Sequence, residues 1–282
     1  MPSIADSDAY FDPRRMLPQH QAALTLLQGV LSNPQMQRLR WLDLACGRGQ
    51  IFSNLLANLS SLERAKLHLC GCDISNEHIR QAQRVTRDVG LAECQFFVCE
   101  LGMFDQDSRT NGVWDFISLT NTVHEISPSQ LSKILVSAVQ RLSHSGCLFI
   151  YDMDRLPHFE LGAVVWTRQE IFEILNTMCT ALGSVGFIPP VGSWQHSTCN
   201  GWNAQIQRAH MQLPEEWTNH VDPAVEATAR CIDRLLRTKL EGVRRALEGL
   251  TLFGSETEGE SQDKDRLLHD YWAISRALGV QL

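Results

Sequence analysis

The chain lacks the features that mark membrane-embedded and exported proteins. No apolar run approaches the roughly 18 residues that a membrane helix needs, and residues 1–6 do not show the charged-then-apolar pattern of a signal peptide. The nine cysteines contain no C-x-x-C pair, and several lie inside apolar runs with strand character. Buried, reduced thiols are therefore expected. These absences predict a cytoplasmic protein that has no membrane partner.

Blocks of positive charge are also missing. The 282 residues include 25 lysines and arginines and 32 acidic residues, so that the net charge is −7. Nucleic acids are usually bound through clusters of basic side chains, and this composition argues against nucleic acid as the main partner. The 44% of hydrophobic residues is enough for one sizeable core.

What the sequence does contain is a ten-residue stretch around which the chain is organised. Residues 41–50, WLDLACGRGQ, read as a buried strand that runs into a turn with two glycines, Gly47 and Gly49. Apolar residues at helical spacing follow from position 51 to 59. A glycine turn lets the backbone approach a ligand closely, and the free N–H groups at the start of the helix point toward it. The stretch predicts half of a nucleotide pocket.

This stretch resembles motif I of the class I S-adenosylmethionine-dependent methyltransferases, in which glycines at every second position follow an acid. Asp43 is the acid, Gly47 and Gly49 are the second and third glycines, and Ala45 stands at the first glycine position. The G-x-G-x-x-G fingerprint of NAD enzymes fits less well, because its third glycine falls on Phe52. The resemblance implies that the chain is an enzyme with S-adenosylmethionine as its cofactor.

Two further strand ends match the family's pattern. Asp73 ends the second strand, where an acid grips the two ribose hydroxyls, although it could instead cap the next helix. Glu100 and Leu101 follow the third strand, at the positions that contact adenine in the family. The resemblance implies the following cofactor-binding residues: Asp43, Ala45, Cys46, Gly47, Gly49, Asp73, Ile74, Glu100, Leu101, Thr120 and Asn121.

His124, soon after the fourth strand, is the candidate catalytic residue. In the resembled family a histidine at this position lies at the lip of the methyl-transfer site, and an imidazole titrates near neutral pH as a general base does. Alternatively, His124 only shapes the pocket wall or caps a helix. It does not belong to an H-E-x-x-H zinc helix, because position 128 is Pro, and no metal is expected.

Candidate acceptor-binding residues come from the least readable segments. They are Tyr10, Phe11, Asp152, Trp194 and His196. The competing interpretations are that Tyr10 and Phe11 anchor a leading helix, that Trp194 packs in the core, and that His196 is solvated.

The order of elements predicts an α/β fold with a Rossmann-like, seven-stranded, mostly parallel sheet. Five strands alternate with helices, and Asn200-Gly201 is the expected turn of a terminal antiparallel hairpin. We expect a helical cap over 1–34, the methyltransferase domain over 35–212, and a helical extension over 213–282 with an acidic linker from Gly254 to Asp263. The apolar stripes of the extension must be buried on the core or in a homodimer.

Three functions follow from these patterns. The first is methyl transfer to an O, N or C atom of a small-molecule acceptor, favoured because the N/D-P-P-Y signature of the enzymes that methylate nucleic-acid amino groups is missing. The second is an RNA methyltransferase, which would need a basic surface built from the scattered arginines. The third is a non-catalytic module that binds the cofactor or dimerises.

Overall fold

The computed structural model describes residues 16–33, 35–91, 93–156, 158, 160–196, 199–252 and 258–280. These residues form two compact units, each assembled from separate segments. The first unit contains the described residues up to Thr120 together with 137–151 and 203–211. The second contains 121–136, 152–202 and 212 onward. The predicted acceptor contacts Tyr10 and Phe11 lie outside the described residues.

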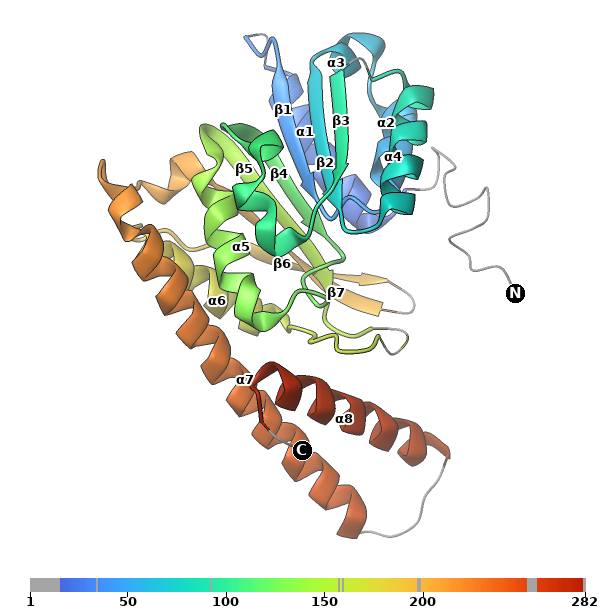
Figure 1. The fold of residues 1–282 in the computed structure, drawn as a ribbon, viewed down its shortest axis with the longest axis vertical. Coiled ribbons are helices and arrows are strands. Elements are labelled where there is room, and N and C mark those ends of the chain that lie inside the picture. Colours follow the sequence, from blue (N-terminus) through green and yellow to red (C-terminus); the bar gives the residue numbers. More distant parts are fainter. Residues whose placement is uncertain are drawn as a thin grey trace. The chain divides into compact units, whose positions relative to one another are not determined.

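A seven-stranded sheet has the order β3-β2-β1-β4-β5-β7-β6 (Figure 1). The strands are β1 (Leu39–Leu44), β2 (Leu67–Asp73), β3 (Glu93–Val98), β4 (Trp114–Thr120), β5 (Leu142–Met153), β6 (Val191–His196) and β7 (Cys199–Gln207). The first five are parallel, and the last two form the terminal hairpin. The predicted Rossmann-like α/β fold is confirmed.

Helices precede and connect the parallel strands of the first unit. They are α1 (Pro18–Leu31), α2 (Gln50–Asn58), α3 (Ser61–Ala65) and α4 (Asn76–Val89), and a further helix, α5 (Pro128–Gln140), begins in the second unit. The Ser75 side chain caps α4 by accepting from the N–H of His78. In Figure 1, α2 and α4 run side by side next to β2 and β3. The core there includes Trp41, whose ring meets Phe52 edge-on at 5.4 Å.

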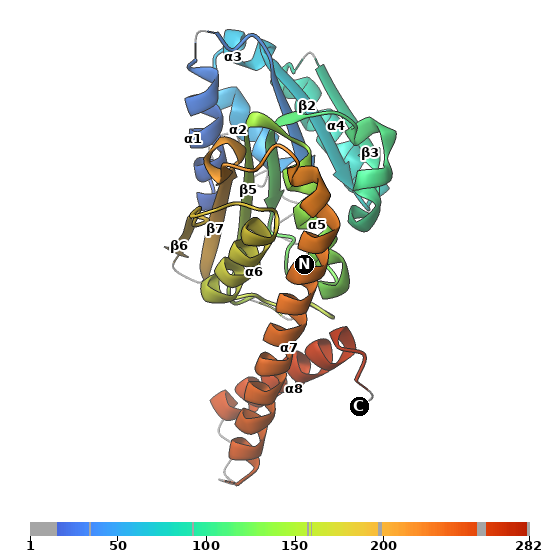
Figure 2. The ribbon, with the colours of Figure 1, turned by 90° about the vertical axis from the view of Figure 1, so that its left-hand side faces the viewer.

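The second unit contains three long helices, α6 (Arg168–Ala181), α7 (Val221–Leu252) and α8 (Glu258–Ala277). A capping box of Thr167 and Glu170 starts α6. Both α6 and α8 contact α7, and Figure 2 shows α8 folded back beside it. The predicted linker is wrong from Glu258 onward, because α8 begins there. Among the helices of the described ranges, none has both the length and the apolar character that crossing a bilayer requires.

Short 3₁₀ helices complete the described elements. They are Leu101–Gln106, Ser108–Thr110, Arg208–Met211 and Trp217–His220.

The terminal hairpin is present, but its predicted turn is wrong. Asn200 and Gly201 lie inside β7. A Cβ on Gly201 would come within 2.4 Å of the Trp194 ring and 2.5 Å of the Asp152 carbonyl oxygen. Glycine is therefore needed here for close packing within a strand.

Candidate active site

Asp43, the acid of the motif, is buried near the end of β1. It is 3% exposed and sits opposite Ser118 of β4, whose hydroxyl donates a short hydrogen bond to its carboxylate. The indole N–H of Trp41 donates in turn to Ser118, at 2.7 Å. Burial raises the pKa of Asp43; the hydrogen bond from Ser118 lowers it, the charge of Asp73 raises it further, and the result is about 7. Asp43 is thus a buried acid whose nearest partner is neutral.

Asp73, the last residue of β2, ties the glycine turn to the start of α4. One carboxylate oxygen accepts from the backbone N–H of Gly47 at 2.9 Å. The other accepts from the backbone N–H of Ser75 at 2.8 Å and lies 3.1 Å from Nδ1 of His78. The structure therefore brings together the two acids and the glycine turn that the sequence pattern links.

The two glycines of the turn have different tasks. Gly47 has a φ of +53°, and a Cβ placed on it would meet nothing within 4 Å. Gly49 has a φ of +77°, and its Cβ would lie 2.8 Å from the Phe52 ring and 2.9 Å from Cα of Ala82. Gly47 leaves bare backbone beside open space, whereas Gly49 allows α2 to pack closely on α4.

Large apolar side chains are exposed where β2 and β3 end. Ile74 is 73% exposed, Val98 46% and Met103 47%. Val98 pairs with Asp73 in the sheet register, so these apolar groups adjoin the acid. An apolar ligand face placed here would remove these side chains from water.

The remaining predicted cofactor residues lie on the turns that follow the strands. Ala45 and Asn121 both have positive φ, of 56° and 53°. Glu100 is exposed at the start of the 3₁₀ helix that Leu101 opens. The partly exposed Thr120 ends β4, and Cys46 is buried between Ala45 and Gly47.

In the second unit, His124 is built into a pair with Asp152. Each is at most 2% exposed. Nδ1 of His124 lies 2.7 Å from one carboxylate oxygen of Asp152, and the backbone N–H of His124 donates to the other oxygen at 2.9 Å. Met153 also donates its backbone N–H to Asp152 at 2.7 Å. The carboxylate of Asp152 is thus committed to orienting the imidazole rather than exposed to an acceptor.

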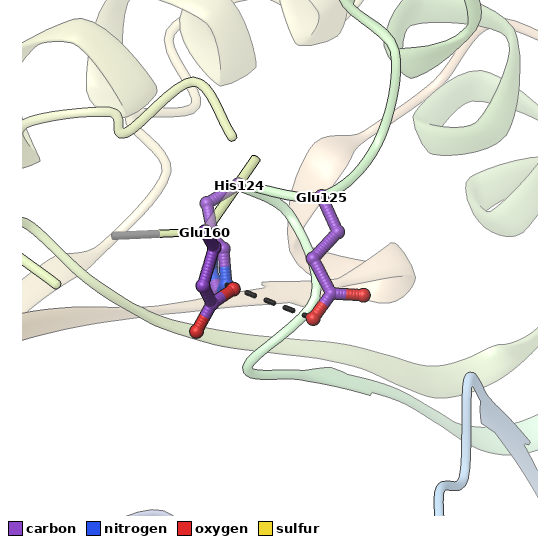
Figure 3. A group of neighbouring side chains, drawn as sticks. All are labelled: His124, Glu125 and Glu160. Atoms are coloured by element: carbon purple, nitrogen blue, oxygen red, sulfur yellow. Dashed lines mark hydrogen bonds and ion pairs between the residues drawn. The ribbon is translucent and has the colours of Figure 1, made fainter. Parts of the chain in front are cut away.

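The other ring nitrogen of His124 faces two glutamates (Figure 3). Nε2 lies 3.0 Å from a carboxylate oxygen of Glu160 and 3.8 Å from one of Glu125. Burial disfavours the imidazolium, but the hydrogen bond to Asp152 and the charges of Asp152, Glu160 and Glu125 outweigh this effect, and the pKa of His124 rises to about 9. His124 is therefore charged at neutral pH in this arrangement.

Trp194 and His196 are the two predicted acceptor-binding residues in the hairpin. Trp194 packs its ring against the backbone of Gly201, which agrees with a packing role. His196 ends β6, and its side chain is outside the described part of the structure.

Two residues of the site were not anticipated from the sequence. Ser118 is a polar residue in an otherwise apolar strand opposite Asp43, and aligning the two strands would have revealed it. Glu160 lies 36 residues from His124 in an irregular segment, and nothing in the local sequence signals it.

Comparison with known proteins places these features in a family. A family profile described as a methyltransferase domain matches residues 36–226. No curated protein matches the sequence.

Several solved structures are similar to the chain. Magnesium protoporphyrin IX methyltransferase (ChlM) from Synechocystis PCC 6803, with bound SAH, shares 16% identity at a TM-score of 0.48, over 67% of this chain and 82% of that chain. A SAM-dependent methyltransferase from Aquifex aeolicus shares 19% at 0.40, over 64% and 89%. TehB from Haemophilus influenzae shares 11% at 0.47, over 66% and 62%.

Proposed function

The chain belongs to the methyltransferase domain family as a class I S-adenosylmethionine-dependent enzyme, and from this premise we propose that it methylates an O, N or C atom of a small molecule. The cofactor of this class is S-adenosylmethionine, which supplies an electrophilic methyl group.

In the first unit, the cradle around Gly47 and Asp73 would hold the cofactor. Each oxygen of the Asp73 carboxylate has lone-pair capacity beyond its present backbone donors, enough to accept from two ribose hydroxyls. Ile74 offers an exposed apolar face for adenine, and Glu100 an acceptor for its amino group. Asp43, buried beside the neutral hydroxyl of Ser118, favours a positively charged ligand.

In the second unit, the His124–Asp152 pair would act as the general base for the acceptor. A hydroxyl, a protonated amine or an acidic C–H must lose a proton before its electron pair can attack. Nε2 of His124 would take that proton, while Asp152 holds Nδ1–H and stabilises the resulting imidazolium. This step needs a neutral imidazole and requires Glu160 to leave Nε2 to the acceptor.

The second unit also offers room of the right scale. A cavity of about 670 Å³ is lined by residues of the segment after β5 and of α7 and α8, among them Glu160, the neighbour of His124. Pockets for small ligands typically enclose roughly 300–1,000 Å³. A net charge of −7 does not favour an RNA backbone.

The test is a transfer assay with labelled S-adenosylmethionine and a panel of phenols, amines, carboxylic acids and acidic C–H compounds. Turnover on at least one compound class is expected, with kcat/KM rising as the pH approaches about 9, where His124 becomes neutral. His124→Gln should keep cofactor binding and lose most of the turnover. Label incorporated into bulk RNA but into none of the small molecules would contradict the proposal, and so would full activity of His124→Gln.

A further inference from the structure

Three side chains of the second unit converge on one point in space. Nε2 of His124 and one carboxylate oxygen each of Glu125 and Glu160 lie within 4.8 Å of one another (Figure 3). His124 and Glu125 follow β4, and Glu160 follows β5. One imidazole and two carboxylates, from two segments of the chain, form a set of donors of the kind that divalent metal ions use.

The separations within this set are those of ligands around one ion. Nitrogen and oxygen ligands lie roughly 2.0–2.2 Å from zinc, so two of them at a tetrahedral or right angle are roughly 3 to 3.5 Å apart. Nε2 of His124 lies 3.0 Å from Glu160 and 3.8 Å from Glu125. Small rotations of the exposed Glu125 side chain and the half-buried Glu160 side chain would bring all three atoms to coordination distance.

A second observation comes from the far side of the imidazole. Asp152, 1% exposed, binds Nδ1 of His124 at 2.7 Å and the backbone N–H of the same residue at 2.9 Å. A carboxylate on the distal ring nitrogen fixes the tautomer and the ring orientation of a metal-binding histidine and makes the other nitrogen a better donor. The buried imidazole is therefore aimed at the two glutamates by a prearranged partner.

The segment that carries Glu160 is fastened to the same place. The backbone N–H of Val164 donates to the carbonyl of His124 at 2.8 Å, and that of Ala163 donates to the carbonyl of Glu160 at 3.1 Å. The first bond connects the two ligand-bearing segments through their main chains, and the second closes a turn within the segment that carries Glu160. The juxtaposition is thus a property of the backbone and does not depend on flexible side chains alone.

Charge and space both favour a cation at this point. Three carboxylates, those of Asp152, Glu125 and Glu160, surround one imidazole, which can neutralise only one of them. Glu125 and Glu160 also line a cavity of about 570 Å³, with Ser127, Ser129 and one cationic side chain, Arg276, on its wall. Water molecules in that cavity could complete the coordination shell of an ion.

From this geometry we infer that His124, Glu125 and Glu160 bind a divalent transition-metal ion such as Mn²⁺ or Zn²⁺. An imidazole with two carboxylates suits these ions better than Ca²⁺, which prefers oxygen donors only. A nitrogen that coordinates an ion cannot accept a proton. If His124 is the general base proposed above, occupancy by the metal inhibits methyl transfer.

The binding test uses the full chain, stripped of metal with a chelator, and titrated with Mn²⁺ by electron paramagnetic resonance and calorimetry. Mn²⁺ is the probe because the thiolates of this cysteine-rich chain prefer softer ions. One site is expected, and Glu160→Gln should weaken it at least about 10-fold, with a similar loss for Glu125→Gln. The matched control is Glu226→Gln, an exposed glutamate on α7 that should bind as wild type does.

Two results would overturn the inference. One is the absence of binding to the wild type at millimolar Mn²⁺. The other is equal affinity for wild type, Glu125→Gln and Glu160→Gln, which would mark the ion as adventitious.

The failure of this inference can be told apart from the failure of the proposed function. Mn²⁺ binding is measured without cofactor or acceptor, so a chain that binds the ion but transfers no methyl group contradicts only the function. A chain that transfers the methyl group and ignores Mn²⁺ contradicts only the metal site.

Discussion

Two buried acids near strand ends, Asp43 in the first unit and Asp152 in the second, differ in the partner that each receives. Asp43 faces the hydroxyl of Ser118, and its pKa rises to about 7. Asp152 faces the imidazole of His124, whose pKa rises to about 9. A buried carboxylate beside a neutral partner thus drifts toward its protonated form, whereas one beside a histidine holds a proton on its partner. A cationic ligand would compensate the charge of Asp43, whereas His124 already compensates that of Asp152.

The largest expected effect comes from breaking the pair of His124 and Asp152. His124→Ala leaves Asp152 buried without its charged partner and should lower the free energy of unfolding by about 3–5 kcal/mol. Urea denaturation at pH 7 measures this loss. Asp152→Asn in the His124→Ala background should recover part of it, because the stranded charge is removed. A loss below about 1 kcal/mol in His124→Ala would show that the pair is not stabilising.

The buried Asp43 should make the free energy of unfolding depend on pH. The pKa of Asp43 is about 7 in the folded chain, against a usual value of 3.8, so the folded state binds more protons between these values. The free energy of unfolding should therefore fall as the pH rises from about 4 to about 7, by on the order of 3 kcal/mol. Asp43→Asn should flatten this part of the curve, as denaturant titrations at several pH values would reveal. An unchanged slope would refute the buried charge.

The next effect concerns cofactor affinity rather than stability. Asp73→Asn replaces one accepting oxygen with a donor and removes the charge, and should weaken S-adenosylhomocysteine binding between about 10- and 100-fold. Asp88→Asn, the same change at an exposed position of α4, is the control and should bind normally. Equal affinities for the two variants in a calorimetric titration would exclude Asp73 from the cofactor site.

The smallest effect separates the two glycines of the turn. Both have positive φ, so alanine is strained at either, but only at Gly49 does a Cβ collide with Phe52 and Ala82. Gly49→Ala should be less stable than Gly47→Ala by roughly 1 kcal/mol or more. Gly47→Ala should lose more cofactor affinity than stability. The reverse order in thermal unfolding and binding experiments would contradict these separate tasks.

Much of the first unit could be predicted because its signals are local. The motif around Asp43 and the apolar runs beside it each lie within a few residues, and the structure has them where the sequence indicates. The hairpin turn was wrongly predicted at Gly201 because a glycine required for long-range packing looks the same in the sequence as a glycine required for a turn.

Of the site around His124, the sequence indicates the histidine but not the side chains that contact it. His124 stands out by its position after a strand, but its partners Asp152 and Glu160 are 28 and 36 residues away. Their approach depends on how the segment after β5 returns to the end of β4, and no short motif encodes that path. Local pattern therefore predicts the strand, turn and helix around Asp43 well and the partners of His124 poorly.

Calorimetric titration of the full chain with S-adenosylmethionine and its demethylated product asks whether the first unit holds an adenosyl sulfonium cofactor. We expect one saturable site per chain for each ligand, weakened in Asp73→Asn and unaffected in Asp88→Asn. Neither heat of binding nor thermal stabilisation at millimolar ligand with the folded wild type would contradict this expectation.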